Sequence, residues 1–121
     1  MKDSINIEKI KVAIRNFAKE RDWDQFHSPK NVATALSIEA SELLELFLWA
    51  SESESKEIMK DETKASKVKE ELADIFYYLI RLSDLLSIDI ESEFWGKLEK
   101  NAQKYPVELS KGNSKKYTEL K

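Results

Sequence analysis

Apolar residues return at helical spacing from the start of the chain. The first predicted helix runs from about Ile5 to Glu20, with its apolar stripe at Ile7, Ile10, Ile14, Phe17 and Ala18. Residues 21–28 break this pattern and indicate an aromatic-rich loop. The chain has only two glycines and two prolines, which favours long helices over a sheet.

Three further helices are predicted, over residues 29–50, 62–87 and 89–105. Ser28 followed by Pro29 is typical of a helix N-cap and first helical position. Residues 51–61 are polar and acidic, as expected of a connection that contains a short helical turn. The pattern therefore predicts an all-α four-helix bundle. Wide apolar stripes place the second and third helices at its centre.

The composition suits a single folded domain. The chain has 121 residues, of which 41% are hydrophobic and 36% are charged. A domain of this length leaves roughly a third of its unfolded surface in water, so self-association would add stability. The segment 110–121 is basic, with four lysines against one glutamate. It could contact a phosphate or serve only as a solvated tail.

Charge and cysteine usage exclude several classes of protein. The net charge of −3 is too small to indicate attraction to a nucleic acid polymer or an anionic membrane. Apolar runs stay far below the ~20 residues of a membrane span, and no apolar stretch follows Met1, so a signal peptide is not expected. The absence of cysteine excludes disulfides and thiolate metal sites and suits a cytoplasmic protein.

Two pairs of carboxylates lie within these apolar stripes. Glu39 and Glu42 are three positions apart on the second helix, and Glu71 and Asp74 are three apart on the third, so each pair shares a helix face. The face that carries Glu39 and Glu42 also carries Trp49 and is expected to point inward. Four buried carboxylates would repel one another, and each would cost several kcal/mol to desolvate without a partner. Protonation or a cation would relieve this, unless the acids lie at the stripe edges in solvent.

A divalent metal is the simpler solution, because neither face supplies an obvious lysine or arginine. Oxygen-only ligands suit Mg²⁺, Mn²⁺ or Ca²⁺. Mg²⁺ often takes substrate phosphates as further ligands, which indicates phosphate chemistry. A di-iron or di-manganese bundle is not favoured, because such sites use Glu-x-x-His on two helices, and the single histidine, His27, lies in a loop.

Two acidic motifs and three further segments of the chain resemble a known protein family. Glu39-Ala-Ser-Glu42 followed by Glu70-Glu71-Leu-Ala-Asp74 is similar to the ExxE…ExxD signature of the MazG-like all-α nucleoside triphosphate pyrophosphohydrolases. The loop 21–29, the helix segment 42–49 and the tail 105–117 resemble the dCTP pyrophosphatase branch. The resemblance covers the chain from about Ile10 onward. Four acids alone are weakly specific, whereas the acids, loop and tail together are highly specific.

The resemblance implies Mg²⁺-dependent hydrolysis of a nucleoside triphosphate to a monophosphate and pyrophosphate, with Mn²⁺ as an alternative cation. Its branch implies dCTP or a modified dCTP as substrate and a role in cleaning the nucleotide pool. It also implies a homodimer or homotetramer. Residues 1–105 would form the helical catalytic domain, and residues 106–121 a basic C-terminal tail of the same domain.

Individual roles follow from the matching positions. The implied metal ligands and catalytic residues are Glu39, Glu42, Glu71 and Asp74. The implied base and sugar pocket consists of Trp23, His27, Trp49 and Tyr78. The implied phosphate contacts are Lys97, Asn101, Lys104 and Tyr105, with Lys111 and Lys116 from the tail.

Each of these assignments has a plainer alternative. An aromatic residue is more often part of a core, His27 could cap and pack beside Ser28, and helical lysines often form a solvated face. Ile38 stands where many bacterial members have a second acid, so the number of metals and the identity of the catalytic base stay open. A non-enzymatic adaptor or dimerisation module would explain the apolar stripes but not the paired acids.

Overall fold

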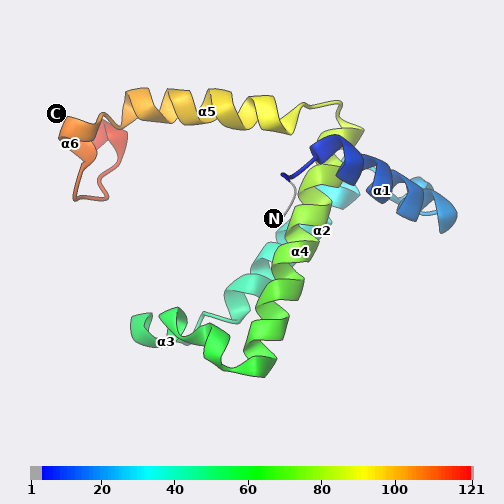
Figure 1. The fold of residues 1–121 in the computed structure, drawn as a ribbon, viewed down its shortest axis with the longest axis horizontal. Helices are drawn as coiled ribbons and strands as arrows, with labels where there is room; N and C mark the ends of the chain where they lie inside the picture. Colours follow the sequence, from blue (N-terminus) through cyan, green and yellow to red (C-terminus); the bar gives the residue numbers. More distant parts are fainter. Residues whose placement is uncertain (1–3, 121) are drawn as a thin grey trace. The chain divides into compact units, whose positions relative to one another are not determined.

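The computed structural model describes residues 4–120, and all regular elements in this range are helical. The α-helices are α1 (Ile7–Glu20), α2 (Pro29–Glu45), α3 (Glu52–Lys56), α4 (Glu62–Leu85), α5 (Ile90–Lys104) and α6 (Val107–Ser110) (Figure 1). Single 3₁₀ turns lie at Asp24–Phe26, Ile58–Lys60 and Tyr117–Glu119. The all-α prediction and the four long helices are confirmed. Across the same residues, no helix has the length and apolar content needed to cross a bilayer.

The chain divides into two compact units after Ser87. The first unit contains α1 to α4, and the second contains α5, α6 and the last 3₁₀ turn. The predicted ranges 1–105 and 106–121 include residues 1–3 and 121, which lie outside the described part of the chain.

Polar side chains define where the long helices begin. In each case the N-cap side chain accepts a hydrogen bond from the backbone N–H three residues later, which satisfies one of the free donors of the first turn. The N-caps of α1, α2, α4 and α5 are Asn6, Ser28, Asp61 and Asp89. Pro29 occupies the first turn of α2, as the sequence predicted.

The second helix is shorter than predicted. It ends at Glu45 rather than near Ala50. Beyond Glu45 the backbone bonds tighten to i→i−3, as in Leu46 N–H to Leu43 and Phe47 N–H to Leu44. Such bonds close a tight last turn and stop helix propagation, so the residues after Glu45 leave the helical face.

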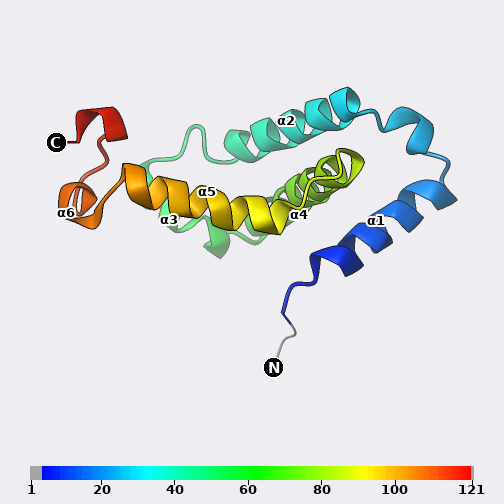
Figure 2. The same ribbon diagram turned by 90° about the horizontal axis from the view of Figure 1, so that it is seen from above.

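The core of the first unit lies where α2 and α1 pack against α4. Figures 1 and 2 show α2 and α4 side by side, with their chains running in opposite directions. The buried apolar residues are Ile14, Ala18, Val32, Ala65, Val68 and Ile80. The prediction that the second and third long helices lie at the centre is confirmed, because these are α2 and α4.

Ile80→Val should measurably destabilise the first unit. The Ile80 side chain is only 2% exposed, and removing one buried methyl group costs about 0.5–1.5 kcal/mol. For a chain of this size we expect the midpoint of thermal unfolding to fall by roughly 2–6 °C. Ile5→Val makes the same change at a side chain that is 72% exposed, so it should leave the midpoint nearly unchanged. Equal shifts for the two variants would contradict this placement of the core.

The second unit is held together at its C-terminal end by aromatic contacts. The rings of Tyr105 and Tyr117 meet edge to face, with centroids 6.2 Å apart. The Lys104 ammonium lies 4.8 Å from the centroid of the Tyr117 ring, at cation–π distance. The described part of the predicted basic tail is therefore not a plain extension, because its short helices return Tyr117 to the end of α5.

Candidate metal centre

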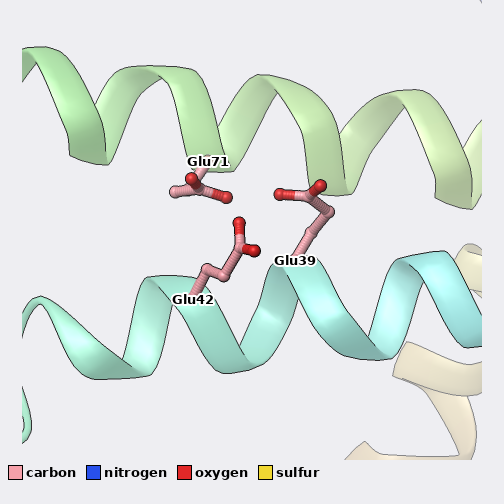
Figure 3. A group of neighbouring side chains, drawn as sticks. All are labelled: Glu39, Glu42 and Glu71. Atoms are coloured by element: carbon pink, nitrogen blue, oxygen red, sulfur yellow. The ribbon is translucent and has the colours of Figure 1, made fainter.

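Three of the four predicted carboxylates converge between α2 and α4. Figure 3 shows Glu39 and Glu42 on α2 directed toward Glu71 on α4. One carboxylate oxygen from each residue lies within 4.8 Å of the other two. The i,i+3 spacing places the two α2 acids on one face, and the packing of α4 against α2 brings Glu71 opposite them.

The cluster leaves two buried oxygens without a partner. Within residues 4–120, and with the acids ionised, the buried Glu39 Oε2 and Glu71 Oε2 accept no hydrogen bond. None of the three carboxylates forms an ion pair with a described lysine or arginine. A buried anionic oxygen without a donor or cation is costly. The donor set is all hard oxygen, so a divalent cation fits the arrangement.

The electrostatics of the cluster are also unusual. The pKa of Glu39 is raised from 4.5 to about 7. The largest cause is a hydrogen bond to Glu71 that only the protonated form of Glu39 can donate, followed by burial and the negative charges of Glu42 and Glu71. Without a cation, a proton on Glu39 relieves part of this repulsion at pH values below about 7.

Asp74 lies outside this close group. It follows Glu71 by one turn of α4, is exposed, and is not among the residues whose oxygens lie within 4.8 Å of one another. Burial raises the pKa of Tyr78, and the charges of Glu39 and Asp74 raise it further. Tyr78 therefore faces the acidic side of α4, next to the cluster.

A row of aromatic rings leads away from the cluster within the first unit. The ring centroids of Tyr78 and Tyr77 are 5.1 Å apart, and those of Tyr77 and Phe17 are 6.3 Å apart. Phe17 is 5.6 Å from Trp23, which is 6.3 Å from His27. The structure thus connects three of the predicted pocket residues, Trp23, His27 and Tyr78.

Phe17, Tyr77 and Arg81 were not predicted to belong to this region. Phe17 was assigned only to the apolar stripe of the first predicted helix. Tyr77 is adjacent in sequence to Tyr78, which was the residue assigned to the pocket. Arg81 is the most informative of the three, because its side chain is buried and hydrogen-bonded to Asp24 and His27. A sequence signal existed: Arg81 is the only lysine or arginine in residues 70–96.

Trp49 is placed differently from the prediction. It was expected on the inward face with Glu39 and Glu42, but α2 ends before it and its side chain is 91% exposed. Trp49 instead lines a pocket of about 520 Å³ at the end of α2, together with Glu45 and Lys67. Glu45 follows Glu42 by one turn and Lys67 precedes Glu71 by one turn, so this pocket borders the acidic cluster.

The predicted phosphate contacts all lie in the second unit. Lys97, Asn101 and Lys104 recur at intervals of four and three along α5, and Tyr105 is its C-cap. Asn101 is half-buried, and its backbone carbonyl accepts a hydrogen bond from the backbone N–H of Tyr105. Lys111 and Lys116 are exposed. Within this unit the structure brings Lys104 and Tyr105 together at Tyr117.

Proteins named for an enzymatic activity align with most of this sequence. The chain is 40% identical over 114 residues to dCTP pyrophosphatase 1 of Rattus norvegicus, which covers 94% of the chain and 67% of the relative. It is 37% identical over the same length to dCTP pyrophosphatase 1 of Homo sapiens, with the same coverage.

A solved structure and a family model agree with these relatives. The crystal structure of a pyrophosphatase from Archaeoglobus fulgidus superposes with a TM-score of 0.77 at 37% identity, covering 88% of this chain and 97% of the other. The model of the MazG-like family matches residues 34–120, a span that includes all four predicted acids. The chain therefore belongs to the MazG-like family.

Proposed function

We propose that this protein is a metal-dependent pyrophosphohydrolase that converts a deoxynucleoside triphosphate and water to a deoxynucleoside monophosphate and pyrophosphate. The observation that carries the proposal is the convergence of Glu39, Glu42 and Glu71, with two buried oxygens that lack a partner. The pyrophosphatase names of the relatives and of the structural neighbour support it.

The cation proposed for the cluster is Mg²⁺, with Mn²⁺ as a substitute. Glu39, Glu42 and Glu71 hold it, and Asp74, one turn after Glu71, is the proposed fourth ligand. When bound, such a cation supplies positive charge to phosphate oxygens and lowers the pKa of a coordinated water. Ca²⁺ also accepts oxygen ligands, but Mg²⁺ is the cation that usually combines one or two carboxylates with waters and substrate phosphates.

The carboxylates also supply the proposed base. Water attacks the α-phosphorus, a new P–O bond forms, and the bond to the oxygen bridging the β-phosphorus breaks, so pyrophosphate leaves. The proton of the attacking water passes to Glu39 or Glu42.

The nucleoside is proposed to bind along the aromatic side of the first unit. Trp23 and Tyr78 offer ring faces on which a nucleobase can stack, and His27 offers a hydrogen bond. Trp49 stays a prediction from the family resemblance alone. The contacts to the phosphates stay a prediction from the family resemblance, and they involve Lys97, Asn101, Lys104, Tyr105, Lys111 and Lys116. The same resemblance supports residues 1–105 as the catalytic domain and residues 106–121 as its tail.

The preferred substrate is proposed to be dCTP or a modified dCTP, which gives the protein a role in cleaning the nucleotide pool. The names of the relatives support this choice. Apolar and aromatic pockets discriminate weakly between close isosteres, so slower turnover of other dNTPs is expected. No nucleic acid polymer or membrane takes part in the proposed reaction.

A cytoplasmic homodimer or homotetramer is the proposed form of the protein. Large apolar side chains are exposed in the single chain on α2 at Ile38 and Leu44, and on α5 at Phe94, Trp95 and Leu98. Exposed apolar surface of this kind favours association between copies. Light scattering coupled to size exclusion would measure the mass, and a monomer at micromolar concentration would contradict the proposal.

The proposed reaction is tested by incubating purified protein with Mg²⁺ and a panel of dNTPs and NTPs. The products would be separated by ion-exchange chromatography. We expect monophosphate and pyrophosphate, fastest from dCTP, and no reaction in the presence of EDTA. Diphosphate and orthophosphate would overturn the point of attack. No turnover of any nucleotide would favour the adaptor or dimerisation module.

A further inference from the structure

Arg81 stands out because it is a buried charge that the proposed reaction does not use. It lies on α4, and only 5% of its surface is exposed. Its Nε–H donates to His27 Nδ1 at 3.1 Å, and its Nη2–H donates to Asp24 Oδ1 at 2.8 Å. Both partners belong to the loop between α1 and α2, so one side chain of α4 holds the loop at two points.

These hydrogen bonds determine the protonation of His27. A guanidinium has only donors, so His27 Nδ1 must accept, and a neutral imidazole that accepts at Nδ1 carries its hydrogen on Nε2. Among residues 4–120, no hydrogen bond to His27 Nε2 is formed. His27 therefore presents a single N–H donor that no described group uses.

The groups around His27 also oppose its protonation. Burial lowers its pKa, the positive charge of Arg81 lowers it further, and Asp24 offsets part of this effect. A second proton would sit on Nδ1 and point at the Arg81 Nε–H, so that two hydrogen-bond donors would face each other. The neutral, Nε2-protonated ring is thus the form that this site stabilises.

The position of His27 connects it with the proposed nucleotide site. Ten residues separate Glu71 from Arg81 along α4, about 15 Å at 1.5 Å per residue. Over this span α4 carries Tyr78, next to the acidic cluster, and Tyr77, whose ring is linked through Phe17 and Trp23 to His27. The free donor therefore stands at the far end of the aromatic row, where the nucleoside is proposed to bind.

We propose that Arg81 is a positioning residue, which holds His27 as a neutral Nε2–H donor to an acceptor atom of the bound nucleotide. This inference rests on the proposed function for the identity of the ligand. The hydrogen bond from Arg81 to His27 does not depend on the proposed function. If Arg81 only attached the loop to α4, its removal would change stability, but it would not act on nucleotide binding through His27.

The first test uses the ring nitrogens of His27. This is the only histidine in the chain, so ¹⁵N shifts of histidine-labelled protein report it without ambiguity. In the unmodified protein we expect the neutral Nε2–H tautomer and a titration midpoint below the ordinary value of about 6.5. Hydrogen on Nδ1 in this protein would overturn the proposal without any variant being made.

The second test removes Arg81 and compares a matched arginine. In Arg81→Leu we expect mixed tautomers, a higher titration midpoint for His27, and a KM for dCTP that rises roughly three- to tenfold, the worth of one hydrogen bond, with kcat little changed. Arg15→Leu is the control, because Arg15 is also paired with an aspartate, Asp84, but does not contact His27. It should leave the nitrogen shifts and KM unchanged.

A double-mutant cycle separates positioning from general loosening of the loop. If Arg81 acts through His27, adding Arg81→Leu to His27→Ala should not raise KM further. An equal rise in both backgrounds, or altered nitrogen shifts with an unchanged KM, would overturn the proposal. Absence of turnover in the unmodified protein would instead contradict the proposed function, while the nitrogen shifts would still decide whether Arg81 fixes the tautomer.

Discussion

Glu71→Gln is expected to abolish both metal binding and nucleotide hydrolysis while the protein stays folded. The amide keeps the shape of the side chain but removes one negative charge from a group of three carboxylates whose oxygens lie within 4.8 Å. Even residues that only support a metal ligand cost 10- to 100-fold in affinity or activity when changed. For a direct ligand we expect kcat/KM to fall by about 100-fold or more.

The same substitution should not destabilise the metal-free protein. Glu71 Oε2 is buried without a hydrogen-bond partner, and an amide N–H at this point can donate to Glu39. Calorimetric titration with Mn²⁺ and thermal unfolding in EDTA would measure the two effects separately. A variant that unfolds in EDTA where the original protein does not would show that the cluster is structural rather than a metal site.

Glu70→Gln is the matched control, because it makes the same carboxylate-to-amide change at the adjacent residue. Glu70 is exposed and lies outside the close group of acids, so this variant should keep its metal affinity and turnover within about twofold, as expected of a surface change. Equal losses in the two variants would contradict the assignment of Glu71. An adaptor protein would have no turnover for either substitution to remove.

The fold was largely predictable because the helix signals in this sequence are local. Asn6, Ser28, Asp61 and Asp89 cap the helices they precede, and each depends only on a backbone N–H three residues away. The end of α2 was missed because its tight last turn carries no glycine or proline to mark it. That error of one turn moved Trp49 from a buried face to an exposed position.

The candidate site was predictable to the extent that it follows helix periodicity. Glu39 and Glu42 share a face by spacing alone, but which acid of the third helix lies opposite them depends on how α2 and α4 are aligned. Periodicity therefore could not tell that Glu71 joins the close group and Asp74 does not. Arg81 was missed for a similar reason, because its partners, Asp24 and His27, lie more than fifty residues earlier in the chain.

The metal-free protein is expected to lose stability as the pH rises from about 5 to 7.5, and Mg²⁺ should restore it. The pKa of Glu39 is raised in the folded protein to about 7 from an ordinary value of 4.5. Below pH 4.5 both the folded and the unfolded state hold this proton. Between 4.5 and 7 only the folded state does, so its advantage declines with rising pH and is lost once the pH passes 7.

A bound cation takes the place of the proton. Binding to the folded state alone adds about 2.7 kcal/mol when the cation is present at 100 times its dissociation constant, which for a chain of this size is roughly 10 °C in the unfolding midpoint. Because the cation competes with the Glu39 proton, this gain should be larger at pH 7.5 than at pH 5.5. Unfolding midpoints in EDTA and in Mg²⁺, measured across this pH range, would test both statements.

Glu39→Gln isolates the group responsible. His27 acts in the opposite direction, because its pKa is lowered in the folded protein and its contribution to stability is therefore lost as the pH falls. The contribution of Glu39 is thus the difference between the pH profiles of the original protein and the variant. In EDTA the variant should no longer lose stability between pH 5 and 7.5, and Mg²⁺ should stabilise it far less. Identical profiles for the two proteins would mean that the proton on Glu39 does not relieve the repulsion in the cluster.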